Sequence, residues 1–289
     1  MDAASQYLLH DCRMGPAEFV SLTMAVSVFS LLLPLVLAQG FKAFSPFATL
    51  RDLGAVIVFA FFILAAEVCF FSCVKLSNAS SAAVLAATKP FWIMGILAAF
   101  ASVLPTWRQL LCGLLAVVGV LLLVTDGHVS NLTLNWLPLL CGLGAAISSA
   151  CYTVQSRGLI SRYGPLRVLL CGLILGAAAA NLYHPFWESF VKWDLLSVLC
   201  IAWVAIVGHI LAYCFYLMSA ARINPSLTGL LETVEPLTAT LLSYLLFKSF
   251  FQIPMLIGGA LILLAVTIIT FTGKPIEEKK RKRSVRAKE

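Results

Sequence analysis

Long apolar runs, separated by short polar stretches, occupy almost the whole chain. Each run continues for about 20 residues, the length that lets an α-helix cross a hydrocarbon core about 30 Å thick. Helices satisfy their own backbone hydrogen bonds in lipid, whereas a transmembrane barrel would show short alternating segments. The pattern predicts nine membrane spans, near residues 17–38, 54–74, 80–102, 109–125, 136–157, 166–187, 195–217, 226–247 and 252–272.

Composition agrees with this pattern and excludes a soluble globule. Of 289 residues, 61% are hydrophobic and 11% are charged, against roughly 45–50% and 25% in soluble domains. The first run has an alternative interpretation as a signal peptide cleaved after Val36-Leu37-Ala38. The segment before it holds Asp2, Asp11 and Glu18 but only Arg13, so it lacks a basic start. We therefore expect an all-α polytopic membrane protein.

The charges predict how the chain is oriented. The tail, residues 274–289, carries eight Lys or Arg and three Glu. A basic run of this kind can also bind nucleic acid. Because it follows the last predicted span, it favours instead a cytoplasmic C-terminus that contacts anionic lipid headgroups. We expect membrane lipid as a partner, no nucleic acid, a cytoplasmic C-terminus and an external N-terminus.

Motifs for enzymatic chemistry or metal binding are missing from the sequence. The nine cysteines are scattered without metal-ligand spacing, and no Walker, HExxH or nucleophile-elbow motif occurs. A membrane enzyme would need a polar cluster at a boundary, for which His184, Glu188 and Asp194 are a thin candidate, more simply an external loop. The N-glycosylation sequon at Asn131 is likewise interpreted as part of an external loop. We expect no cofactor, no metal and no enzyme activity.

The chain repeats itself, which predicts two halves. A shift of 146 residues aligns Asn78 with Asn224, Ser80 with Ser226, Pro90 with Pro236, Gly113 with Gly259, and Lys89 with Glu235. The predicted units are residues 1–126 with four spans, 127–273 with five spans, and the tail 274–289. An odd number of spans per unit would invert one copy relative to the other, as in many secondary transporters. The first unit lacks the helix that this plan expects at its start.

Four segments carry a resemblance to a known family: SSAAVLAATKPFWIMGILAAF, SSACYTVQSRGLISRYGP, INPSLTGLLETVEPLTATLLSYLLF and IGGALILLAV. They resemble the EamA-type family of the drug/metabolite transporter superfamily. The resemblance implies ten helices in two inverted five-helix halves around a central cavity, in a bacterial cytoplasmic membrane, moving small metabolites such as amino acids. The chain departs from the family at its missing first helix and at Lys248-Ser249, where the family usually has an acidic residue.

Few charged residues fall deep inside the predicted spans, away from the span ends, where each costs about 3 kcal/mol unless it is paired or hydrated. They are Lys89, Glu232, Glu235 and Glu67, with His209 as a further titratable group. The repeat makes Lys89 and Glu235 equivalent, and Glu232 lies one turn before Glu235. We hypothesise that Lys89 pairs with Glu235 or Glu232 in the cavity, where the pair binds zwitterions or carries a proton. The alternative is an ion pair that only fixes helix register.

The other candidates have simpler alternatives. Glu67 is either a cavity group or hydrated near the external end, and His209 either relays protons or bonds a neighbouring helix. Four further side chains offer aromatic or amide contacts to a metabolite, with packing as the alternative: Tyr152, Gln155, Trp92 and Tyr213. Glycines at 113, 119, 258 and 259 indicate close helix packing, within the chain or at a homodimer contact.

The sequence thus predicts a secondary active transporter of small polar or amphipathic metabolites, exporting by alternating access and coupled to protons. A nucleotide-sugar or phosphorylated-metabolite exchanger is the alternative. It would need several Lys or Arg in the cavity to meet phosphate charge, and only Lys89 lies deep in a span.

Overall fold

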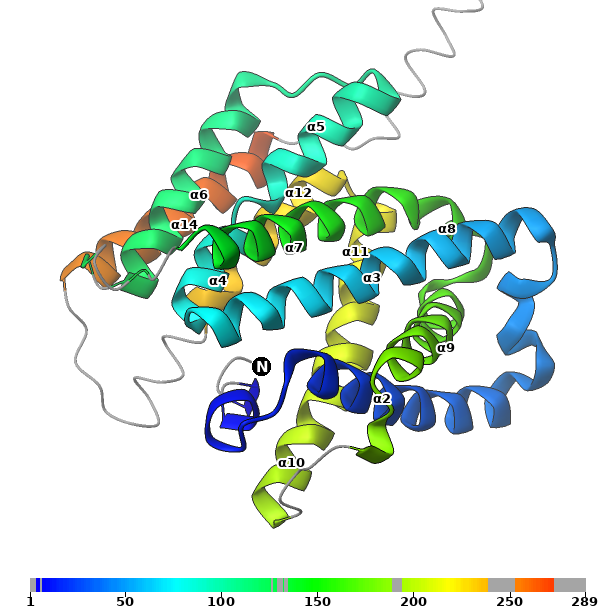
Figure 1. Ribbon diagram of the computed structural model, residues 1–289. Coiled ribbons are helices and arrows are strands. Elements are labelled where there is room, and N and C mark those ends of the chain that lie inside the picture. Colours follow the sequence, from blue (N-terminus) through cyan, green and yellow to red (C-terminus); the bar gives the residue numbers. More distant parts are fainter. Residues whose placement is uncertain are drawn as a thin grey trace, which may run out of the picture.

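The computed structural model describes residues 4–5, 7–125, 127–128, 132, 135–188, 194–238 and 253–272. Every regular element among these residues is a helix, as the apolar runs predict (Figure 1). The first half contains η1 (Tyr7–Asp11), α2 (Pro16–Gln39), η2 (Gly40–Phe47), α3 (Leu50–Leu76), α4 (Ala79–Ala86), α5 (Lys89–Ala101) and α6 (Trp107–Thr125). The second half contains α7 (Trp136–Gln155), α8 (Arg157–Tyr163), α9 (Pro165–Tyr183), η4 (Phe186–Glu188), α10 (Leu195–Trp203), η5 (Val204–Ala212), α11 (Tyr213–Arg222), α12 (Pro225–Glu232) and α14 (Ile253–Thr272).

Eight helical segments in the described part of the chain are long and apolar enough to span a membrane, and they match eight of the nine predicted runs. Their outer faces carry exposed large apolar side chains such as Phe29, Phe61 and Phe100, as lipid contact requires. The ninth run, 226–247, is described only as α12 and helical residues 234–238. The predicted end of the run 195–217 was too early, because the helix continues to Arg222.

Two spans are interrupted where the repeat places its shared prolines. The span Ala79–Ala101 divides into α4 and α5 at a turn over Ala87 and Thr88, so Pro90 lies in the first turn of a new helix. In the second half, α12 ends at Glu232 and helix resumes at residue 234. A first turn has no intrahelical partner for its N–H groups, so proline fits there without loss of a bond. Both breaks therefore place an ionisable residue, Lys89 or Glu232, at a helix end.

Asn78 and Asn224, which the repeat aligns, are both N-caps. Asn78 accepts a hydrogen bond from the Ser81 amide at 2.7 Å and begins α4. Asn224 accepts from the Ser226 amide at 3.1 Å, with Pro225 as the first residue of α12. The two halves thus use the same residue type to begin equivalent helices.

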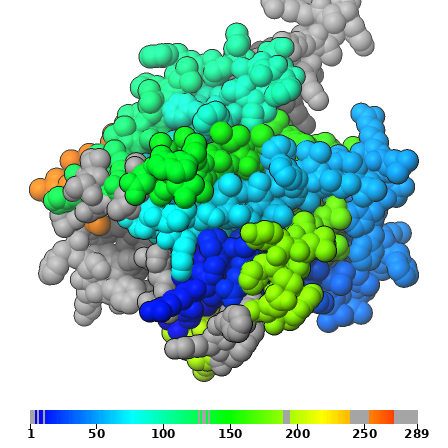
Figure 2. All heavy atoms as spheres, viewed as in Figure 1, coloured from blue at the N-terminus to red at the C-terminus, as the bar shows by residue number. Residues whose placement is uncertain are grey.

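Helices at equivalent positions of the repeat pack against each other, α2 against α9 and α6 against α14, and α12 packs against α5, the helix that follows its counterpart α4. The halves also interleave, because α7 of the second half lies along α3 and α5 of the first. Figure 2 shows this interleaving, with the green atoms of α7 filling the space between cyan and teal segments of the first half. A cavity between the halves is therefore walled by both.

Several predictions fall on residues that the structure does not describe. The sequon residues Asn131 and Thr133, the pair Lys248-Ser249 and the tail 274–289 all lie outside the described residues. The division of the chain at residue 126, the external N-terminus and the cytoplasmic C-terminus stay predictions.

Candidate functional site

A cavity of about 330 Å³ lies between the two halves. Its walls come from α3, α4 and α6 of the first half and from α7, η5, α11 and α12 of the second, with Lys89 at the break between α4 and α5. Alanines occupy much of the wall and leave the space open: Ala66, Ala83, Ala86, Ala87, Ala145 and Ala146. The polar groups of the cavity are therefore set in an apolar surface, as in many ligand sites.

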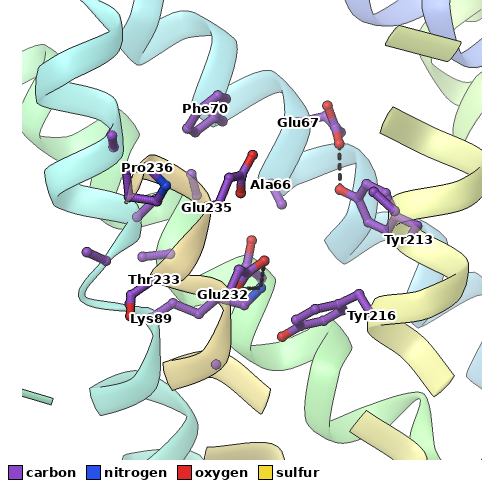
Figure 3. A pocket seen from close by; sticks show the side chains of 18 of the residues that line it. Ala66, Glu67, Phe70, Lys89, Tyr213, Tyr216, Glu232, Thr233, Glu235 and Pro236 are labelled. Atoms are coloured by element: carbon purple, nitrogen blue, oxygen red, sulfur yellow. Dashed lines mark hydrogen bonds and ion pairs between the residues drawn. The ribbon is translucent and has the colours of Figure 1, made fainter. Parts of the chain in front are cut away.

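Lys89 forms an ion pair with Glu232 on the cavity wall. Its Nζ atom lies 2.8 Å from Glu232 Oε2 and donates to Oε1 at 3.1 Å. The Lys89 side chain is 5% exposed, while that of Glu232 is 34% exposed toward the cavity. Of the two partners that the sequence offered, Glu232 is the one in contact, as Figure 3 shows.

Tyrosine side chains surround the Lys89 ammonium. Its Nζ atom lies 4.2 Å from the ring centroid of Tyr216 and 5.2 Å from that of Tyr152, distances typical of cation–π contact. Nζ also donates to the Tyr152 hydroxyl at 3.5 Å. The Thr153 hydroxyl donates its proton to the Ser149 carbonyl. In the 2.8 Å hydrogen bond between Thr153 and Tyr216, the Tyr216 hydroxyl is therefore the donor and Thr153 Oγ1 the acceptor. These bonds fix the rings around the ammonium.

A second buried cluster is centred on Glu67 of α3. The Tyr213 hydroxyl donates to Glu67 Oε1 at 2.5 Å, and His209 Nε2 lies 3.5 Å from Oε2 (Figure 3 shows the tyrosine contact). The side chains of Glu67 and His209 are 8% and 1% exposed. Glu67 and Tyr213 line the cavity, whereas His209 lies behind them.

Ser27 of α2 determines which nitrogen of His209 carries hydrogen. Ser27 Oγ donates to the Thr23 carbonyl at 2.6 Å and lies 3.0 Å from His209 Nδ1. Because the Ser27 hydroxyl already donates its proton to Thr23, His209 Nδ1–H is the donor in the hydrogen bond between His209 and Ser27. In the neutral ring Nε2 then presents a lone pair toward the Glu67 carboxylate. Two acceptor atoms therefore face each other in a buried place, 3.5 Å apart.

Glu235 also lines the cavity, one turn beyond Glu232. Figure 3 shows its carboxylate extending toward Ala66 and Phe70 of α3, away from Lys89. Glu235 is exposed and lies just after the helix break that follows Glu232. Pro236 lies beside it on the same wall.

Two predicted site residues lie elsewhere. Gln155 donates from Nε2 to the Ala55 carbonyl at 2.7 Å and holds the end of α7 against α3. Trp92 is 38% exposed and is absent from the cavity wall. The sequence reasoning missed Tyr216, Ser149 and Ser27. Tyr216 lies one turn after Tyr213, so a test for aromatic residues on the same face would have found it.

A polar network joins the two halves at the other end of α3. Asp52 pairs with Arg162 at 2.8 Å and accepts hydrogen bonds from the Tyr163 hydroxyl at 2.7 Å and the Thr49 hydroxyl at 2.8 Å. The bond to Asp52 raises the pKa of the Tyr163 phenol. Arg167 donates to Gln39 Oε1 at 2.6 Å nearby. Fifteen residues separate Asp52 from Glu67, about 22 Å along a helix, so this network closes the structure away from the cavity.

Over the described ranges no three His, Cys, Asp or Glu side chains gather as metal ligands. The site consists of helix breaks, buried ionisable groups and a cavity between two interleaved halves. This arrangement, within a set of membrane-spanning helices, is that of a polytopic membrane carrier.

Comparison with known proteins identifies the family. The model of the EamA-like transporter family matches residues 3–125 and 136–271. The chain is 27% identical over 274 residues to the "Uncharacterized inner membrane transporter YicL" of Salmonella typhimurium, covering 93% of this chain and 90% of that protein. A solved structure described only as "Crystal structure of protein" shares the fold, with TM-score 0.75, 18% identity and 94% of each chain covered.

The chain belongs to the EamA-like transporter family. It is an integral membrane transporter with the two-repeat helical architecture of that family.

Proposed function

We propose that the chain is a secondary active transporter that exports small polar or amphipathic metabolites, such as amino acids, by alternating access and in exchange for protons. The observation that carries the proposal is the Lys89–Glu232 ion pair, buried on the wall of a cavity between the two halves. An ion pair that only fixed helix register would not need an open space beside it. Here the exposed edge of Glu232 faces that space, where a solute can compete for it.

The proton-coupled part of the proposal is supported by Glu67 and His209. We propose that their facing acceptor atoms share one proton next to the cavity, where Tyr213 links Glu67 to the cavity surface. Protonation and solute binding would then act on the same wall of the cavity.

The test is solute and proton flux in proteoliposomes that contain the purified full chain. A panel of amino acids and amines would be supplied on one side, with an internal pH dye reporting protons. We expect some solutes to move protons, and we expect Lys89→Met and Glu232→Gln to abolish both fluxes. Glu188→Gln removes a carboxylate from η4, which does not line the cavity, and is the matched control with wild-type flux. Full transport by Lys89→Met would refute a role of the pair in transport.

A further inference from the structure

We infer that the solute bound in this cavity is a net cation, an organic amine with an apolar or aromatic body; this rests on the carrier function proposed above and narrows its solutes from amino acids to amines. Four observations carry the inference: the charge of the wall, the occupied state of Lys89, the tyrosine rings, and the lack of donors for a second anion.

The charge of the cavity wall is negative. Its described lining holds three carboxylates, Glu67, Glu232 and Glu235, and one ammonium, Lys89. One positive and three negative charges leave a formal charge of −2, or −1 if a proton is held between Glu67 and His209. Such a wall attracts cations and repels anions, and the effect is strong where little water screens it.

The ammonium of Lys89 is already fully occupied. Glu232 at 2.8 Å neutralises it, two tyrosine rings cover it, and its side chain is 5% exposed. The carboxylate of a zwitterion would have to replace Glu232 and would leave a glutamate unpaired in a buried place, which is costly. The part of the wall open to a solute is therefore the carboxylate part.

The same tyrosines show which ligand chemistry the wall accepts. Lys89 is an alkyl ammonium, and the structure holds it between a carboxylate and the faces of Tyr152 and Tyr216. Tyr213 lies 5.9 Å from Tyr152, centroid to centroid, and extends the aromatic wall toward Glu67. A solute amine near Glu235 and the exposed edge of Glu232 meets carboxylates of the same kind, with Tyr213, Phe70 and the alanine wall available to its apolar body.

Donors that could receive an anionic group are scarce in the described lining. The hydroxyls of Tyr213 and Thr233 already donate, to Glu67 and to the Leu230 carbonyl. Tyr216 donates to Thr153 Oγ1, so the hydroxyls of Tyr152 and Ser149 are the remaining ones in the described lining. Phosphates and carboxylates usually require Arg, Lys or several N–H groups, so sugar phosphates and free acids fit this wall poorly.

The test uses three probes that share one phenyl ring and differ in charge: phenethylamine as the cation, phenylalanine as the zwitterion and phenylpropionate as the anion. Binding to the purified full chain in detergent is measured by calorimetry, and uptake is measured separately in proteoliposomes. We expect the amine to bind at least about tenfold more tightly than the zwitterion, and the anion to bind weakest, because one added charge contact has about this effect. Glu235→Gln should weaken amine binding by about tenfold.

Two further variants keep the test decisive. Glu235→Asp retains the charge and should retain at least part of the amine affinity, whereas Glu188→Gln should bind as wild type. Preference for the zwitterion or the anion, absence of amine binding, or amine binding unchanged in both Glu235→Gln and Glu232→Gln would overturn the inference. Amine binding that is lost in Glu235→Gln, without uptake of any probe, would support the inference and contradict the proposed transport function.

Discussion

At the scale of single residues, the ion pair of Lys89 and Glu232 is the feature that sequence and structure share. The repeat singled out Lys89, and the spacing of one turn kept Glu232 and Glu235 open as its partners. The sequence could not choose between them, because the choice depends on the helix break after Glu232. Glu232 lies before the break and forms the ion pair with Lys89, whereas Glu235 lies after it on the cavity wall.

The pair predicts strong coupling between the two residues. Lys89→Met leaves a partly hydrated carboxylate, while Glu232→Gln leaves a buried ammonium without its counter-charge. We expect Glu232→Gln to destabilise the chain by about 3 kcal/mol, the lower end for a broken buried pair because Glu232 is partly exposed. The double variant should be more stable than Glu232→Gln. Denaturation in mild detergent measures all three variants, and strictly additive effects would show that the pair is uncoupled.

Ser27 offers a second test at this scale. Ser27→Ala removes the hydroxyl that accepts from His209 Nδ1, so the ring is free to carry its hydrogen on Nε2 and donate it to Glu67. We expect a loss of about 1 kcal/mol in stability and fewer protons moved per solute in proteoliposomes. The control is Ser161→Ala, on exposed α8, whose hydroxyl bonds only within its own helix. An unchanged proton-to-solute ratio would contradict the role of His209 in proton binding.

At the scale of the helices, the apolar runs predicted most of what is observed. Run length and N-cap residues predict where α3, α4, α7 and α12 begin within a few residues, because these features act locally. The π-helix η5, which carries His209, has no such local sign, since its wider turn depends on packing against α2. Gln155 and Trp92 were candidates by residue type, and only the orientation of their helices shows that they face away from the cavity.

The contact between α6 and α14 predicts a steric effect at Gly119. A Cβ atom there would lie 2.8 Å from the Gly258 carbonyl oxygen and 2.8 Å from an Ile262 side-chain carbon. We expect Gly119→Ala to destabilise the chain by about 1–3 kcal/mol, because two helix backbones would have to separate. Gly95→Ala in α5, where nothing lies within 4 Å, is the matched control and should be neutral or slightly stabilising. Equal melting temperatures of the two variants in detergent would contradict this packing.

At the scale of the whole molecule, polar contacts join the two halves at one end of α3 and the cavity lies nearer the other end. The cavity residues of α3 lie in its C-terminal half, Ala66–Phe71, while Asp52 at its start joins Tyr163 and Arg162 of the second half. In the alternating-access mechanism that we propose, this end would open in turn. The bonds that would then break are those that cross between the halves there: Asp52 to Tyr163, Asp52 to Arg162, Gln155 to Ala55 and Arg167 to Gln39.

Weakening this network should therefore loosen one end of the molecule and leave the rest intact. In Asp52→Asn the ion pair to Arg162 is lost and the bond from the Tyr163 hydroxyl is weakened, because a neutral amide is a poorer acceptor than a carboxylate. Hydrogen exchange followed by mass spectrometry should show backbone amides of α8 and the start of α3 exchanging about tenfold faster, as expected for a loss near 1.4 kcal/mol. Amides of α6 and α14, which pack on each other away from the network, should be unchanged. Arg108→Gln, at the exposed start of α6, is the control. Faster exchange across all helices would mean that Asp52 holds the whole fold together, and no change at α8 would mean that the two halves are joined there by other contacts.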